Sequence, residues 1–120
     1  MLTNEDTMTQ KNMLLSTPPY EVEKEIRKLG DNLRTARLRR GLTIKDVAEK
    51  IGTGVRSISD AEKGKASASV AIYYALLWAY GLLKQTNTLA DPTTDFVGIT
   101  LSDRNKPKRA KTTKGIDNDF

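Results

Sequence analysis

The chain has 120 residues, including 20 Lys or Arg and 15 Asp or Glu for a formal charge of +5, and it contains no cysteine and no histidine. This length suits one domain with a small core. The missing residue types exclude disulfides, thiolate nucleophiles, imidazole bases and Cys/His zinc sites, but leave carboxylate chemistry open. The carboxylates show no clear shared pocket or metal-ligand spacing and there is no phosphate loop, so neither an enzyme, nor a metal site, nor a cofactor is expected.

The charge is unevenly distributed along the chain. Residues 1–26 hold five acidic and two basic side chains, residues 27–40 hold one acidic and six basic, and residues 104–114 hold six basic and none acidic. Two separated basic patches favour a polyanionic partner, nucleic acid before membrane, although solvated surface charge is the alternative interpretation.

Residues 1–19 are expected to form a flexible N-terminal arm, because no apolar period is sustained before Pro18-Pro19. The start of the chain lacks a basic segment followed by an apolar one, so no secretory signal is expected, and a cytoplasmic location suits the absence of cysteine. From Val22 to Ala36 apolar residues recur at helical spacing, with arginines on the other face, and Gly41 ends this predicted helix.

Two short helices are predicted next. Thr43 and Asp46 form a capping-box-like start to "IKDVAEKI", which ends at Gly52, and "GVRSISDAEKG" gives another helix closed by Gly64. Three helices separated by glycines predict an all-α domain with tight turns.

Residues 66–83 form an uncharged stretch long enough for a membrane span, but two serines, three tyrosines and a glycine argue against one. We expect instead a helix from Ser69 to about Tyr80 that is apolar all round. The side chains left over after core packing are expected to cover a dimer or partner face, or to lie under the C-terminal segment: Tyr73, Leu77 and Trp78.

The remaining residues are harder to assign. Residues 84–103 form a C-terminal extension, with a linker or short strand near 85–90 and a helix start at Asp91-Pro92. Residues 96–102 alternate like a strand although the preceding cap favours a helix, so both structures stay open. Residues 104–120 are expected to be a basic tail that is disordered without a partner. The boundaries therefore place the helical domain at 20–83.

The run "LGDNLRTARLRRGLTIKDVAEKIGTGVRSISDAEKG" combines a small Ala48, a turn at Gly52, Ile58 six residues later and Glu62-Lys63-Gly64 at its end. It strongly resembles the Cro/CI-type (XRE) helix-turn-helix family over residues 29–82. The resemblance implies a compact, lambda-repressor-like bundle of four to five helices whose third helix enters the major groove of DNA.

The same resemblance assigns roles residue by residue. Positions that contact base edges are matched by Val55, Arg56 and Asp60. Positions at the groove wall or phosphate backbone are matched by Thr43, Lys45, Gly54, Ser57, Ser59, Lys63 and Lys65. A structural ion pair is implied between Arg37 and Glu62. Arg56 suits bidentate contact with guanine, or a phosphate, while Asp60 suits cytosine N4 or an (i, i+4) pair with Arg56.

Residues 89–111, "LADPTTDFVGITLSDRNKPKRAK", look like the extension of HipB-like antitoxins. This resemblance implies a homodimeric operon repressor that reads a palindrome on double-stranded DNA and binds a HipA-type kinase toxin. The basic tail would contact DNA or toxin through Lys106, Lys108, Arg109 and Lys111. The alternatives are a stand-alone phage-type or regulatory repressor, and a helix-turn-helix-fold protein-interaction module that no longer reads DNA.

Overall fold

The computed structural model describes residues 13–106. Most of the predicted arm, residues 1–12, and the tail residues Lys108, Arg109 and Lys111 lie outside this range. The chain divides into two units, Met1–Lys84 and Gln85–Phe120. All regular elements within residues 13–106 are helical, which confirms the predicted fold class. No helix in that range is long and apolar enough to cross a membrane.

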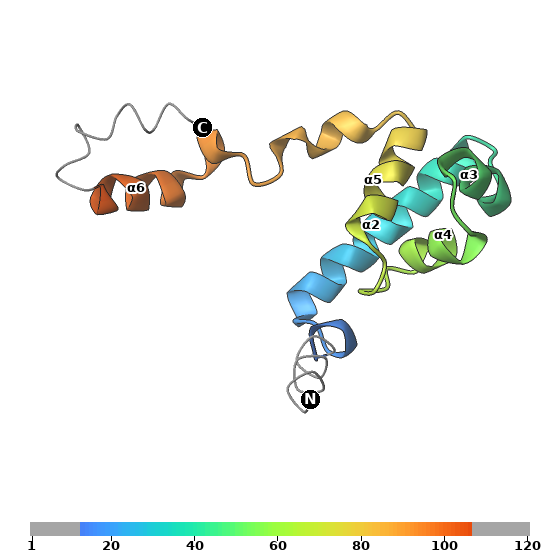
Figure 1. Cartoon of the computed structure of the whole chain (residues 1–120), viewed down its shortest axis with the longest axis horizontal. Helices are drawn as coiled ribbons and strands as arrows, with labels where there is room; N and C mark the ends of the chain where they lie inside the picture. The colour runs from blue at the N-terminus through green and yellow to red at the C-terminus, as the bar shows by residue number, and fades with distance from the viewer. Residues whose placement is uncertain (1–12, 107–120) are drawn as a thin grey trace, which may run out of the picture. The chain divides into compact units, whose positions relative to one another are not determined.

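The first unit is a bundle of four α-helices, preceded by a helical turn at residues 13–16 where the loose arm was expected (Figure 1). The helices are α2 (Tyr20–Arg39), α3 (Ile44–Ile51), α4 (Val55–Glu62) and α5 (Val70–Ala79). Helix α4 contacts α2, α3 and α5, and α3 also contacts α5. The short pair α3–α4 is thereby held on the long α2 by packing, which is the arrangement of a helix-turn-helix bundle.

Local chemistry sets the ends of α3. The Thr43 hydroxyl accepts from the Asp46 N–H at 3.0 Å, and the Asp46 carboxylate accepts from the Thr43 N–H at 2.9 Å, which completes the predicted capping box. At the other end Gly52 has a φ of 79°, and its N–H donates to the Ala48 carbonyl at 2.9 Å. This left-handed residue lets the chain turn at once into α4.

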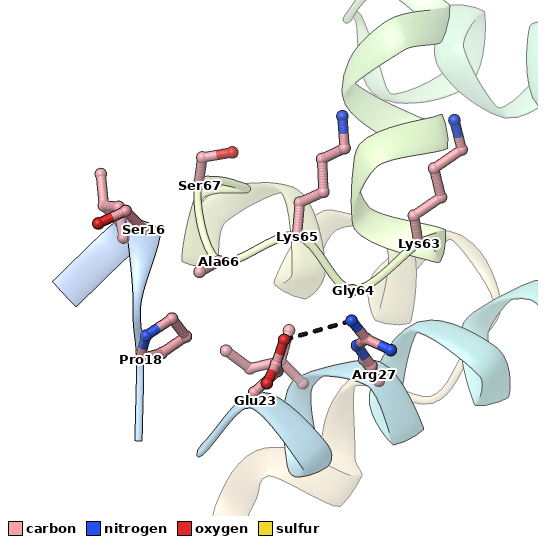
Figure 2. Close-up of a pocket in the computed structure, with 11 residues that line it drawn as sticks. Ser16, Pro18, Glu23, Arg27, Lys63, Gly64, Lys65, Ala66 and Ser67 are labelled. Atoms are coloured by element: carbon pink, nitrogen blue, oxygen red, sulfur yellow. Dashed lines mark hydrogen bonds and ion pairs between the residues drawn. The ribbon is translucent and has the colours of Figure 1, made fainter. Parts of the chain in front are cut away.

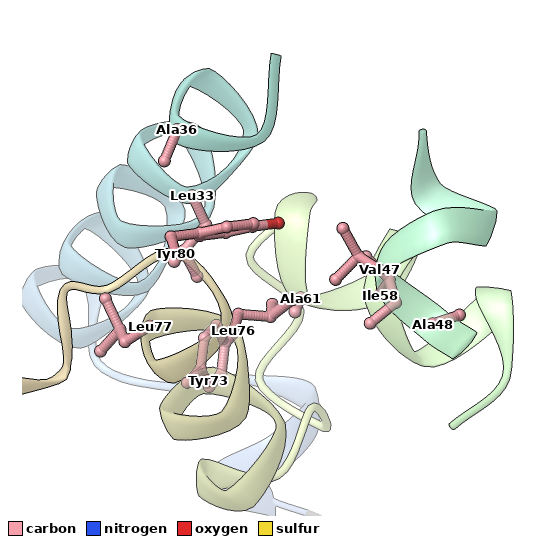
Figure 3. Close-up of a cluster of buried hydrophobic side chains, with 10 residues drawn as sticks. All are labelled: Leu33, Ala36, Val47, Ala48, Ile58, Ala61, Tyr73, Leu76, Leu77 and Tyr80. Atoms are coloured by element: carbon pink, nitrogen blue, oxygen red, sulfur yellow. The ribbon is translucent and has the colours of Figure 1, made fainter. Parts of the chain in front are cut away.

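The core lies between α2 and the other three helices (Figure 3). The α5 side chains that enter it include Tyr73, Leu76 and Leu77. Tyr73 and Leu77 were expected outside the core, on a dimer or partner face or under the C-terminal segment, and that prediction is wrong. Helix α5 is apolar on every side, so its sequence does not reveal which side packs inward. Only Trp78 of the predicted face remains exposed, with the Lys50 ammonium 5.9 Å from its ring centre.

The linker has no strand at residues 85–90. It forms the 3₁₀ helix η1 (Leu83–Thr88), after which the Leu89 N–H donates to the Thr86 carbonyl at 3.2 Å. A strand needs a partner strand for its backbone groups, and none exists within residues 13–106. Hydrogen bonds between residues three apart in the segment satisfy these backbone groups instead.

The open question at residues 96–102 resolves as a helix. Asp91 caps only the short 3₁₀ helix η2 (Pro92–Thr94), and Asp95 then caps α6 (Phe96–Asn105) by accepting from the Gly98 N–H at 2.9 Å. The boundary predicted at residue 104 was therefore slightly early, since α6 continues to Asn105. Lys106, the one described residue of the predicted basic tail set, is the C-cap of α6.

Candidate nucleic-acid interface

Helix α4 has an inner and an outer face. Ile58, Ala61 and Glu62 are buried against the bundle, whereas Val55 and Arg56 are exposed. Next to the outer face lies a hollow of about 450 Å³. The residues that line it are Ile44, Val55, Arg56, Ser59, Asp60, Lys63 and Lys65. The structure thus brings together all three predicted base-contacting residues with Ser59 and both lysines of the following turn.

Four predicted backbone or groove-wall residues do not line this hollow: Thr43, Lys45, Gly54 and Ser57. Gly54 is the N-cap of α4 and provides no side-chain cap, while Lys45 is exposed on α3. Ile44 lines the hollow although its sequence position suggested only core packing. Its apolar side chain, half-buried at the start of α3, had no feature that distinguished it from a core residue.

The backbone N–H of Thr43, a residue matched to a groove-wall or phosphate-backbone position, is not a free donor. Its N–H already donates to the Asp46 carboxylate, and this bond is the main reason that the pKa of Asp46 is lowered. The Thr43 hydroxyl accepts from the Asp46 N–H but retains its own proton. The Thr43 hydroxyl and the Lys45 ammonium are therefore the side-chain donors at this helix start.

Asp60 pairs with Lys65 rather than with Arg56. The Lys65 ammonium lies 3.3 Å from the Asp60 carboxylate, across the turn that ends α4. Within residues 13–106, the Arg56 side chain makes no hydrogen bond or ion pair. The carboxylate therefore positions a lysine at one end of the hollow and leaves the Arg56 guanidinium with all five N–H donors available.

The C-terminal end of α4 is held by a buried ion pair between Arg37 and Glu62, the two residues predicted to form one. Arg37 donates to Glu62 through Nε at 2.7 Å and through Nη2 at 3.0 Å, and its Nη1 donates to the Leu42 carbonyl at 2.9 Å. Both side chains are about one-tenth exposed or less. The hydrogen bond to Glu62 raises the pKa of Arg37 above its usual value. One guanidinium thus joins α2, the α2–α3 turn and the end of α4.

Gly30 also positions α4, and sequence analysis missed it. A Cβ at this residue would lie 2.7 Å from the carbonyl oxygens of Ala61 and Glu62. The absence of a side chain therefore lets α2 approach the last turn of α4 backbone to backbone. A glycine in the middle of an otherwise regular helical pattern was the available indication.

Helix α6 presents apolar side chains to solvent. No residue of η1, η2 or α6 is buried. The large exposed side chains of α6 are Phe96, Val97, Ile99 and Leu101. Exposed apolar clusters of this kind typically mark surfaces for another protein.

Comparison with known proteins agrees with this geometry. A family model described as a helix-turn-helix domain matches residues 28–89, just over half of the chain. The matched range contains α3, α4 and α5 together with most of α2. No curated protein and no solved structure matches the chain. The family match supports DNA as a partner.

Proposed function

Because the chain belongs to the helix-turn-helix domain family, we propose that it is a transcriptional repressor that binds DNA sequence-specifically through α4 in the major groove. The observation that carries this proposal is the hollow along α4, which is lined by the unpaired Arg56 guanidinium, by the apolar Val55 and by Lys63 and Lys65 of the turn that follows the helix. Major-groove readers need this combination of base-reading and phosphate-binding side chains.

The proposal assigns roles to five residues of the hollow, Val55, Arg56, Asp60, Lys63 and Lys65, and to Thr43 and Lys45 outside it. Arg56 donates to O6 and N7 of a guanine, and Val55 packs on a thymine methyl group. Lys63, the Thr43 hydroxyl and Lys45 contact phosphates on either side of the groove. Asp60 accepts from a cytosine amino group, or orients Lys65 through the 3.3 Å ion pair. The Arg37–Glu62 pair positions α4 without touching DNA.

We propose further that the repressor acts as a homodimer on a palindromic operator in the cytoplasm, and as the antitoxin of a HipA-type kinase toxin. One copy of α4 reads only a half-site, so a two-fold pair is needed for tight binding. The exposed apolar side chains of α6 and the HipB-like sequence of residues 89–111 support this role. These exposed side chains of α6 are available to contact the second copy or the toxin.

The test of DNA binding is fluorescence anisotropy with the promoter DNA of the protein's own operon and a scrambled duplex, at several salt concentrations. A preference for the promoter that persists as salt rises supports sequence-specific binding, since phosphate contacts alone are lost at high salt. Equal binding to both duplexes would contradict it.

A second candidate function is protein interaction without DNA reading, and the exposed apolar residues of α6 favour it. Light scattering on the Leu101→Ser variant and the unchanged chain, alone and with the operon's kinase, separates the two candidates. Loss of dimer or of kinase binding in the variant, with promoter binding present in the unchanged chain, supports the antitoxin. Kinase binding by a chain that does not bind its promoter would instead indicate the interaction module.

A further inference from the structure

A second hollow, a cleft of about 290 Å³, lies beside the turn that follows α4 (Figure 2). Its walls come from residues 15–18, from the first half of α2 and from residues 63–67. Arg27 brings a guanidinium to this cleft, and Glu23 is the only carboxylate among its lining residues. Arg27 and residues 66–67 of this cleft have no role in the proposed function.

The position of Arg27 is fixed relative to α4. Gly64, in the turn after α4, has a φ of 71°, and a Cβ there would lie 2.6 Å from the Arg27 Cα. The turn therefore packs with its backbone directly against α2 at Arg27. The same turn is attached to α5, because the Tyr73 hydroxyl donates to the Lys65 carbonyl at 3.4 Å. A ligand that positions α4 thus positions Arg27 as well.

The cleft offers hydrogen-bond donors suited to an anion. The Arg27 guanidinium lies 3.2 Å from the Glu23 carboxylate, in an exposed pair that is easily exchanged for another acceptor. Ala66 and Ser67 line the cleft, and their backbone N–H groups have no acceptor within residues 13–106. A guanidinium and unpaired backbone N–H groups from residues that line one cleft form a donor set that phosphate oxygens satisfy.

The cleft continues the hollow along α4. Lys63 and Lys65 line both, and in Figure 2 their side chains extend on the far side of the turn from Arg27. Positively charged side chains therefore lie along the outer face of α4, at the turn that follows it and on α2. A duplex that receives α4 in its major groove carries a phosphate strand past this turn.

We infer that the cleft binds a backbone phosphate of the DNA, outside the base pairs that α4 reads, through Arg27 and the turn at residues 66–67. In the free protein Glu23 holds the Arg27 guanidinium near this position. The inference rests on the proposed function and adds to it a contact that sets affinity and orientation but not base choice.

The test compares Arg27→Ala with Arg34→Ala, which removes the same charge from an exposed position of α2 that does not line the cleft. We expect Arg27→Ala to weaken promoter and scrambled DNA alike, by roughly tenfold at low salt. We also expect it to reduce the slope of log affinity against log salt by about 1. Glu23→Gln, which leaves Arg27 without its competing carboxylate, should tighten both duplexes by roughly twofold.

Equal affinities and slopes for Arg27→Ala and Arg34→Ala would overturn the inference, even if the unchanged protein prefers its promoter. Failure of the unchanged protein to prefer its promoter would instead overturn the proposed function. The alternative ligand for this cleft is a free phosphate ion, which is tested by titration with inorganic phosphate at constant ionic strength. Saturable phosphate binding that Arg27→Ala abolishes, with DNA affinity unchanged, would assign the cleft to a small free anion and overturn the DNA contact.

Discussion

The Glu62 carboxylate, at the last residue of α4, accepts two hydrogen bonds from Arg37 of α2, at 2.7 and 3.0 Å. This bidentate pair is buried, so the orientation of α4 depends on an interaction inside the bundle rather than on its surface. The pair is weak evidence for net stability, because desolvation of two charges offsets their attraction. Removal of only one partner, however, leaves the other charge buried without compensation.

Replacement of Glu62 by Ala should lower the free energy of unfolding by about 3 kcal/mol, because it leaves the Arg37 guanidinium buried without its acceptor. Urea denaturation measures this change. In the double variant Arg37→Ala/Glu62→Ala the loss should be clearly smaller than the sum of the two single losses. Additive losses would show that the two side chains act independently.

Gly30→Ala tests the contact between α2 and the end of α4. Alanine is the better helix former by about 1 kcal/mol, but its Cβ would lie 2.7 Å from two backbone carbonyl oxygens. Overpacking of this kind costs about 1–3 kcal/mol, so we expect a net loss of stability. Gly54→Ser is the matched control, since nothing lies near its Cβ and a serine would cap α4. A more stable Gly30→Ala variant would contradict the close approach.

The local features of this bundle could be predicted from the residues themselves, whereas the long-range Arg37–Glu62 pair was predicted only through the family resemblance, and the buried side of α5 was not predicted. The Thr43–Asp46 capping box and the turn at Gly52 involve residues within one helical turn of each other, so their spacing is visible in the chain. The buried side of α5 depends on which helices lie against it, and an all-apolar helix has no pattern that reveals them. The Asp60–Lys65 pair likewise depends on the path of the turn after α4, which brings the two side chains together.

Asp46 should make the stability of the fold depend on pH in the acidic range. Hydrogen bonds from Thr43 hold its pKa in the folded chain below the ordinary value of 3.8. The carboxylate therefore stabilises the fold fully above the unfolded-state pKa, and this contribution is lost as the pH falls through the lower folded-state value. We expect Asp46→Asn to lower Tm near pH 7, and the difference from the unchanged chain to shrink below about pH 4. A difference that stays constant with pH would contradict this assignment.

Asp60→Asn should raise affinity for scrambled DNA by roughly two- to fivefold and reduce the preference for the promoter. The substitution removes a negative charge from the hollow along α4 and releases the Lys65 ammonium from its 3.3 Å pair. Anisotropy titrations with both duplexes measure the two affinities. Glu49→Gln, an equivalent change on α3 outside the hollow, is the control. Unchanged binding to scrambled DNA by Asp60→Asn would show that this carboxylate lies away from the phosphates.

The most direct test of DNA reading by α4 is the ratio of promoter to scrambled affinity in Arg56→Ala, measured beside Lys63→Ala. A bidentate contact with guanine is worth about 1–3 kcal/mol, so the ratio should fall roughly 5- to 150-fold in Arg56→Ala. In Lys63→Ala both affinities should fall together and leave the ratio unchanged. If Arg56→Ala instead lowered the affinities for promoter and scrambled DNA equally, the guanidinium would contact only phosphate. This result would contradict sequence reading by α4 through Arg56.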